Sequence, residues 1–196
     1  MNAVGYRLLS WLSFWMFRRK VLREAGPGQG GVCAEIGVWK GDFSRRILDF
    51  LRPKELHLID PWSFAPDFPQ RWYGGAFARS QADMDAIHRA VQDRFRTEPA
   101  VRVHRGSSIE LSATFPDGYF DWIYIDGDHS RQAVFDDLRA WHKKVRSGGL
   151  LVLDDYHWRD ESGQHSVKAA IEDFLALTQV KQARLHAGQF VIELNQ

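Results

Sequence analysis

Two apolar stretches of the sequence end in acidic residues. Residues 122–125 are followed by Asp126-Gly127-Asp128-His129, and residues 150–153 are followed by Asp154-Asp155. If both stretches are parallel strands of one sheet, their carboxyl ends lie at the same edge, so we expect Asp126, Asp154 and Asp155 to converge. Neighbouring carboxylates repel one another unless a positive group lies between them. An all-oxygen set suits Mg²⁺, so these residues predict a divalent-metal site. The alternative is that the acidic residues cap helices or pair with arginines.

A second group of polar and glycine residues follows the earlier apolar stretches. Glu35-x-Gly37-x-x-x-Gly41 leaves a predicted strand and opens a helix, and its glycines let the backbone approach a ligand. The pattern is not the GxGxxG of dinucleotide sites, and a carboxylate at Glu35 suits a ligand that bears an ammonium group. Asp60 ends the next strand, where it can accept hydrogen bonds from ribose hydroxyls. Gly106-Ser107-Ser108 follows the third strand and fits either an adenine contact or a helix cap.

These residues require a sheet whose strands alternate with helices. The apolar runs predict strands at 32–36, 56–59, 101–104, 122–125, 150–153 and 190–194. Helical periodicity and capping residues predict helices at 42–51, 85–95, 130–144 and 166–177. Repeated β-α-β units with continuously apolar strands indicate an α/β protein with a parallel sheet covered on both faces.

Composition limits the possible partners. The 196 residues fit one domain, and 26 basic against 25 acidic residues give a net charge of +1, so nothing favours nucleic acid as a partner. Cys33 is the single cysteine, which is compatible with a reducing, cytoplasmic setting. No zinc-binding spacing of Cys and His occurs in the sequence.

The first 30 residues differ in character from the rest. Residues 8–17 are apolar and aromatic, too short to cross a bilayer, and are followed by Arg18, Arg19, Lys20 and Arg23. A helix here either packs on the domain or on a second copy in a homo-oligomer, or lies at a membrane surface with the basic cluster on headgroups. We therefore divide the chain into an N-terminal amphipathic helix with a Gly-rich linker, residues 1–30, and a domain at 31–196.

The ordered set Glu35-x-Gly37-x-x-x-Gly41, Asp60, Gly106-Ser107-Ser108, Asp126-Gly127-Asp128-His129 and Asp154-Asp155 resembles the class I S-adenosylmethionine-dependent methyltransferases. It is most similar to the divalent-metal-dependent O-methyltransferases, which include catechol and macrolide-sugar enzymes. The resemblance covers about residues 31–194. It implies a Rossmann-like fold with a seven-stranded, mostly parallel sheet, an antiparallel last strand and helices on both faces.

The resemblance also implies roles for single residues. It implies that the Glu35 motif contacts the methionine part of the cofactor, that Asp60 contacts the ribose, and that the serines contact the adenine. The full set of implied cofactor contacts is Glu35, Gly37, Val38, Gly41, Asp60, Ser107, Ser108 and Asp126. The metal ligands are Asp126, Asp154 and Asp155. The family often has Asn as the third ligand, so Asp155 is a departure that makes the site more anionic.

The expected function is methyl transfer from S-adenosylmethionine to a hydroxyl of a sugar, glycoside or catechol-like small molecule, assisted by Mg²⁺. His129 is the expected base, since its ordinary pKa is near neutrality, and His157 and His165 are rivals. The aromatic segment 61–83 is expected to be a substrate lid or wall, or else an oligomer contact. The alternatives are a metal-independent methyltransferase, a nicotinamide-dependent oxidoreductase, and a non-catalytic nucleoside-binding or membrane-docking protein.

Overall fold

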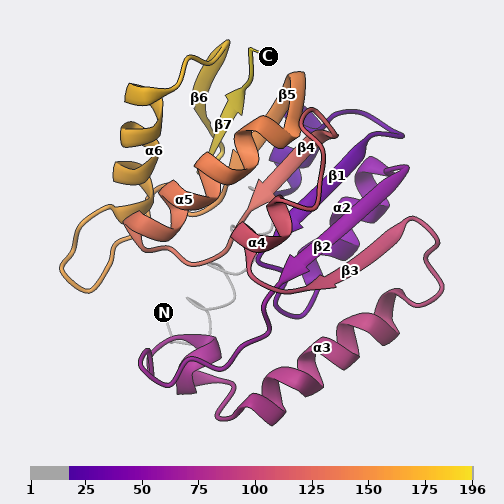
Figure 1. The fold of residues 1–196 in the computed structure, drawn as a ribbon, viewed down its shortest axis with the longest axis vertical. Helices are drawn as coiled ribbons and strands as arrows, with labels where there is room; N and C mark the ends of the chain where they lie inside the picture. The colour runs from indigo at the N-terminus through magenta and orange to yellow at the C-terminus, as the bar shows by residue number, and fades with distance from the viewer. Residues whose placement is uncertain (1–17, 196) are drawn as a thin grey trace, which may run out of the picture.

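The computed structural model describes residues 18–195, which form one seven-stranded sheet with helices on both faces (Figure 1). The strands lie in the order β3-β2-β1-β4-β5-β7-β6. Strands β1 to β5 run parallel, and β7 is antiparallel to both of its neighbours. The strands are β1 (Val32–Ile36), β2 (Glu55–Asp60), β3 (Val101–Arg105), β4 (Phe120–Ile125), β5 (Val145–Leu153), β6 (Gln182–His186) and β7 (Gln189–Glu193). The expected α/β fold with an antiparallel last strand is confirmed.

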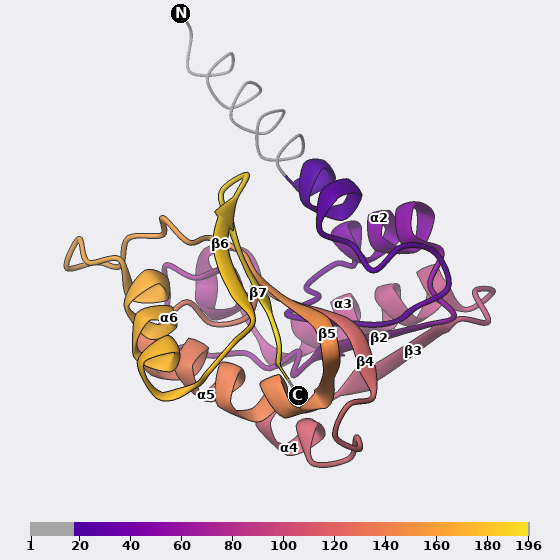
Figure 2. The same ribbon diagram turned by 90° about the horizontal axis from the view of Figure 1, so that it is seen from above.

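The helices cover the sheet in two groups, which Figure 2 separates clearly. Helices α2 (Asp42–Leu51) and α3 (Gln81–Phe95) lie on one face, and α4 (Ser108–Ser112), α5 (Arg131–Trp141) and α6 (Ser166–Leu177) lie on the other. Short turns of other helix types are η1 (Trp72–Ala76) and η2 (His142–Lys144). Ser130 caps α5 as expected, because its hydroxyl accepts a hydrogen bond from the amide of Ala133 at 3.3 Å.

Strand β1 explains how one sheet serves two cores. Successive side chains of a strand point to opposite faces, so Cys33 packs with α2 and α3, whereas Ala34 and Ile36 pack with α5 and α6. Both groups are buried. This is why the central strands are apolar without interruption and why the polar residues gather where the strands end.

The chain before β1 belongs to the first of these cores. Residues 18–24 are helical, and Val21, Leu22 and Ala25 are buried in the same cluster as Cys33. The indole of Trp122 in β4 donates a hydrogen bond to the carbonyl of Ala25 at 2.8 Å. The expectations for residues 8–17 lie outside the described residues. Among residues 18–195, no helix is both long and apolar enough to traverse a lipid bilayer.

Several elements differ from the prediction, among them the short helix α4, which was not predicted, and α5, which ends at Trp141 rather than near residue 144. Gly148 and Gly149 were expected to form a turn, but both lie within β5, where the pairing with β4 shifts in register and Gly148 has φ 70°. Strand β6 was not predicted, because it is an edge strand with a largely polar sequence. Helix α3 begins at Gln81, so the irregular segment after β2 covers residues 61–80.

Candidate active site

The polar residues gather at the carboxyl ends of β1, β4 and β5. The strand order reverses between β1 and β4, and ligands of such sheets bind outside the strand ends at this point. The loops here approach closely. A Cβ on Gly37 would lie 2.1 Å from the carbonyl oxygen of Asp126, and Gly37 has φ 89°, so only glycine fits.

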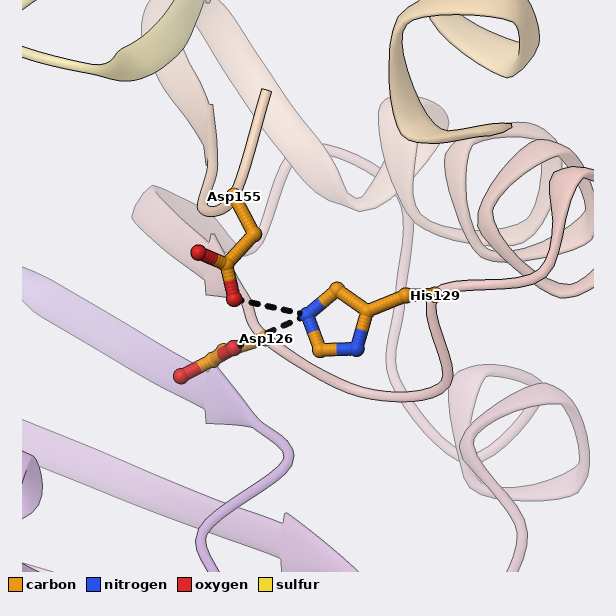
Figure 3. A group of neighbouring side chains, drawn as sticks. All are labelled: Asp126, His129 and Asp155. Atoms are coloured by element: carbon orange, nitrogen blue, oxygen red, sulfur yellow. Dashed lines mark ion pairs between the residues drawn. The ribbon is translucent and has the colours of Figure 1, made fainter. Parts of the chain in front are cut away.

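The ring nitrogen Nε2 of His129 faces two of the predicted metal ligands, Asp126 and Asp155 (Figure 3). Its Nε2 is 3.0 Å from a carboxylate oxygen of Asp155 and 3.5 Å from one of Asp126. These three side chains each offer one ligand atom within 4.8 Å of the others, so they are able to hold a metal ion. Burial lowers the pKa of His129, but the two carboxylates outweigh burial and raise the pKa to about 10. The ring is therefore protonated at neutral pH.

Asp154 lies on the other side of Asp126 and has different partners. Its carboxylate accepts hydrogen bonds from Arg18 and, at 3.0 Å, from the amide of Gln189 in β7. Arg18 also bonds to Asp126 at 2.5 Å. The sequence grouped Asp154 with Asp126 and Asp155 around a cation, whereas the structure places the guanidinium of Arg18 between Asp126 and Asp154. Arg18, the first of the basic residues that follow the apolar stretch 8–17, is only 6% exposed.

The charges of these residues alternate in space. The order Asp154, Arg18, Asp126, His129, Asp155 places a positive group between each pair of carboxylates. Burial raises the pKa of Asp126, but Arg18 and His129 outweigh burial and lower it below its usual range. Burial and the charge of Asp126 raise the pKa of Asp154 to about 6, so both acids are ionised at pH 7.5.

Asp60 uses both of its oxygens to hold the neighbouring loops. One oxygen accepts the amides of Val38 and Trp39, each at 2.9 Å, and the other accepts the amide of Trp62 at 2.7 Å. Trp39 and Trp62 have φ of 52° and 42°, a left-handed conformation that non-glycine residues seldom adopt. The carboxylate expected to bind ribose thus also stabilises two strained tryptophans beside the strand ends.

Glu35 lies beneath the surface rather than at it. Its side chain accepts a hydrogen bond from Ser44 of α2, and the residue is 1% exposed. Burial raises the pKa of Glu35 to about 8, which makes it a neutral acid at pH 7. Gly41 precedes α2 with φ 74°, and a Cβ there would lie 2.8 Å from the ring of Phe95.

The two serines after β3 have separate positions. Ser107 stands at the N-cap of α4, where its side chain makes no capping hydrogen bond. Ser108 points inward: its hydroxyl donates to the carboxylate of Asp137 and accepts from the indole of Trp141 at 2.8 Å. Burial raises the pKa of Asp137 to about 6. Sequence reasoning weighed an adenine contact against a cap for these serines and did not foresee this internal bridge.

The segment 61–80, which we call the bridging segment, reaches across to the loops after β4 and β5. The hydroxyl of Tyr73 donates to Asp128 at 3.0 Å, Gln70 bonds to Glu161, and the guanidinium of Arg71 lies 5.2 Å from the ring of Trp158. The other side of the segment packs against the loop after β1, where Trp39 contacts Trp72 and Phe77 with ring centroids 5.8 and 5.6 Å apart.

The three histidines proposed as bases have different surroundings. His157 is exposed, and its carbonyl oxygen lies 3.1 Å from Nδ1 of His165. Neither of these two is paired with a carboxylate among the ion pairs of residues 18–195, whereas His129 lies between Asp126 and Asp155 and against the ring of Trp158, with centroids 5.0 Å apart. Arg18, Ser44 and Gln189 were not predicted to be site residues.

Comparison with known proteins identifies the family to which the chain belongs. Residues 34–156, well over half of the chain, match a family described as a methyltransferase domain. The chain belongs to this methyltransferase family. With the fold above, it is a class I S-adenosylmethionine-dependent methyltransferase, and the matched residues run from β1 through the acidic exit of β5.

Solved structures share the fold of this methyltransferase at low sequence identity. The O-methyltransferase NovP is 19% identical, with a TM-score of 0.61 over 92% of this chain and 78% of its own. A Corynebacterium glutamicum protein is 17% identical, with a TM-score of 0.59 over 92% and 79%. Aeropyrum pernix fibrillarin, solved with bound S-adenosyl-L-methionine, is 16% identical, with a TM-score of 0.58 over 88% and 70%.

One curated sequence resembles a short part of the methyltransferase. An uncharacterised protein of Acanthamoeba polyphaga mimivirus is 46% identical over 43 residues. The match covers 22% of this chain and about a fifth of the viral protein's length, 19%. It therefore adds no information on activity.

Proposed function

We propose that this methyltransferase transfers a methyl group from S-adenosylmethionine to a hydroxyl of a small molecule, such as a sugar, a glycoside or a catechol-like ring, with help from a divalent cation. The observation that carries the proposal is the group of Asp126, His129 and Asp155, whose ligand atoms lie within 4.8 Å of one another beside the strand ends. The two carboxylates suit Mg²⁺ or Mn²⁺, and the imidazole nitrogen favours a transition metal such as Mn²⁺ over Mg²⁺.

The residues around this group fit the requirements of methyl transfer. A sulfonium methyl group is already a good electrophile, so the protein mainly has to orient the donor and the acceptor. Asp60 fixes the loops after β1 and β2 through three amide hydrogen bonds. The bridging segment, with Tyr73 bonded to Asp128, would limit access of water to the acidic group as a lid.

The acceptor hydroxyl must lose a proton during transfer. A bound divalent cation supplies this chemistry by lowering the pKa of the hydroxyl. With its pKa raised to about 10 by Asp126 and Asp155, the imidazole of His129 already holds a proton at Nε2. It therefore serves as a base only in its neutral form, and only where its Nε2 lone pair is not bound to the cation.

Metal-independent methyl transfer is the second candidate, favoured by a different observation. Arg18 already supplies a positive charge to Asp126 and Asp154, so these acids need no cation for charge balance. In this alternative the acidic residues have a structural role. The acceptor must then be a better nucleophile than a hydroxyl group, because no metal ion activates it.

The two candidates are separated by activity in the presence of a chelator. Formation of S-adenosylhomocysteine is measured with a catechol, a hexose glycoside and an amine as acceptors, with Mg²⁺ or with excess EDTA. The metal-assisted proposal expects loss of O-methylation in EDTA, recovery when Mg²⁺ or Mn²⁺ is added, and loss in Asp155→Ala. Full activity in EDTA would show that the reaction needs no metal ion. Methylation of the amine alone would show that the acceptor is not a hydroxyl group.

A further inference from the structure

Arg18 is a buried cation that lies against the acidic group and comes from outside the β-α-β core. It is the first described residue of the helix that precedes β1, and its guanidinium bonds to Asp126 and Asp154. The aromatic rings of Phe43 and Tyr124 lie 5.0 and 5.7 Å from the guanidinium carbon. Arg18 is therefore held by two carboxylates and two rings, and a planar fork of this kind suits a buried position between carboxylates.

Exposure differs between the two sides of Asp126. The side chains of Arg18 and Asp154 are 7% and 2% exposed, whereas those of His129 and Asp155 are 19% and 34% exposed. Asp126 contributes one oxygen to each side, Oδ2 to Arg18 and Oδ1 to His129. A cation that enters from solvent thus meets Asp155 and His129 first, and Arg18 already lies against Asp154.

Charge balance supports the same division. Asp126, Asp154 and Asp155 carry three negative charges when ionised, and Arg18 contributes one positive charge that no ordinary pH removes. The three carboxylates and Arg18 together keep a net charge of minus two. One divalent cation would balance this charge if His129 is neutral when the cation is bound. Without Arg18 the same three acids would attract a cation into the deeper side as well.

We propose that Arg18 is a positioning residue that keeps Asp154 out of the metal-ligand set, so that the divalent cation binds on the side of Asp126 where His129 and Asp155 lie. This inference rests on the proposed function for the existence of the cation site. It goes further because it states that Arg18, in the helix before β1, determines which of the acidic residues bind the cation.

The test is Mn²⁺ binding to the full chain at pH 7.5, with free Mn²⁺ measured by electron paramagnetic resonance. In the native background, Asp155→Ala should weaken binding by about tenfold or more, as expected for loss of a ligand, and Asp154→Ala should change the dissociation constant by less than about threefold. Arg18→Gln should tighten binding by about tenfold, because it removes a positive charge close to the bound cation. Asp154→Ala added to Arg18→Gln should remove that gain. Thermal melts establish that each variant is folded.

The outcomes separate this proposal from the proposed function. If Asp154→Ala in the native background weakens binding as much as Asp155→Ala, Asp154 is a ligand and the proposal on Arg18 is wrong, and this comparison stands even if Arg18→Gln does not fold. If the native chain binds no Mn²⁺ but Arg18→Gln binds it in a manner that depends on Asp154, Arg18 excludes a cation from Asp154, but the proposed position of the cation beside His129 and Asp155 is wrong and the metal-assisted function fails. If neither chain binds Mn²⁺, both fail.

Discussion

Replacement of Glu35 by Gln should make the free energy of unfolding less dependent on pH. Glu35 is fully buried, and its pKa is raised from 4.5 to about 8, mainly by burial. Between these two values the folded protein keeps a proton that the unfolded chain has released, so the stability of the native protein falls as pH rises. At about 1.4 kcal/mol per pKa unit, the loss is about 5 kcal/mol over the whole range and about 3 kcal/mol between pH 5.5 and 7.5.

The Gln side chain has the shape of the protonated acid and still accepts a hydrogen bond from Ser44, so Glu35→Gln avoids this loss. Urea unfolding followed by tryptophan fluorescence at pH 5.5, 6.5 and 7.5 measures the effect. The difference in unfolding free energy between variant and native protein should change by about 3 kcal/mol in favour of the variant over this interval.

A matched control is Glu110→Gln, because the side chain of Glu110 is exposed on α4. It should follow the pH dependence of the native protein. Parallel curves of unfolding free energy against pH for Glu35→Gln and the native protein would contradict this expectation, since they would mean that Glu35 is ionised in the folded state in spite of its burial.

Three further substitutions have expected effects on stability, each measured by urea unfolding. Gly37→Ala should prevent folding or cost more than about 3 kcal/mol, because its Cβ would lie 2.1 Å from a backbone oxygen; Gly30→Ala, at a similar φ with no atom within 4 Å, should cost only about 1 kcal/mol. Asp60→Ala should cost about 4 kcal/mol, because three amide donors lose a charged acceptor. Asp137→Asn should gain about 2 kcal/mol of unfolding free energy relative to the native protein between pH 4 and pH 7. Burial raises the pKa of Asp137 from 3.8 to about 6, so the native protein loses stability as this carboxyl ionises. Each prediction has an outcome that would contradict it. These outcomes are native-like stability of Gly37→Ala, unchanged stability of Asp60→Ala, and an Asp137→Asn protein whose stability relative to the native protein does not rise with pH.

The central strands and the residues that end them were predictable from sequence. Runs such as 122–125 are apolar because both faces of the sheet are covered, and the acidic residues after them follow from the change of environment at a strand end. Helix α5 was predictable for a local reason, the capping serine at position 130. Patterns of this kind depend on neighbours in the chain, so one sequence is enough to find them.

The partners within the site were not predictable to the same degree. Arg18 is 108 positions from Asp126 in the chain, and nothing near it distinguishes it from Arg19, which is exposed. Asp60 accepts hydrogen bonds from backbone amides, which every residue except proline carries, so no residue type in the sequence marks these partners. Strand β6 has no apolar run because it lies at the edge of the sheet.

The bridging segment has a kinetic consequence. Its contacts with the opposite loops are the Tyr73 hydroxyl bond, the Gln70–Glu161 bond and the Arg71–Trp158 contact, each contributing about 1 kcal/mol at a partly exposed position. Lifting the segment on this side therefore costs only a few kcal/mol and leaves the sheet intact. If the bridging segment is the lid proposed above, we expect it to open and close within microseconds to milliseconds, so that donor and acceptor would exchange with solvent while the domain stays folded.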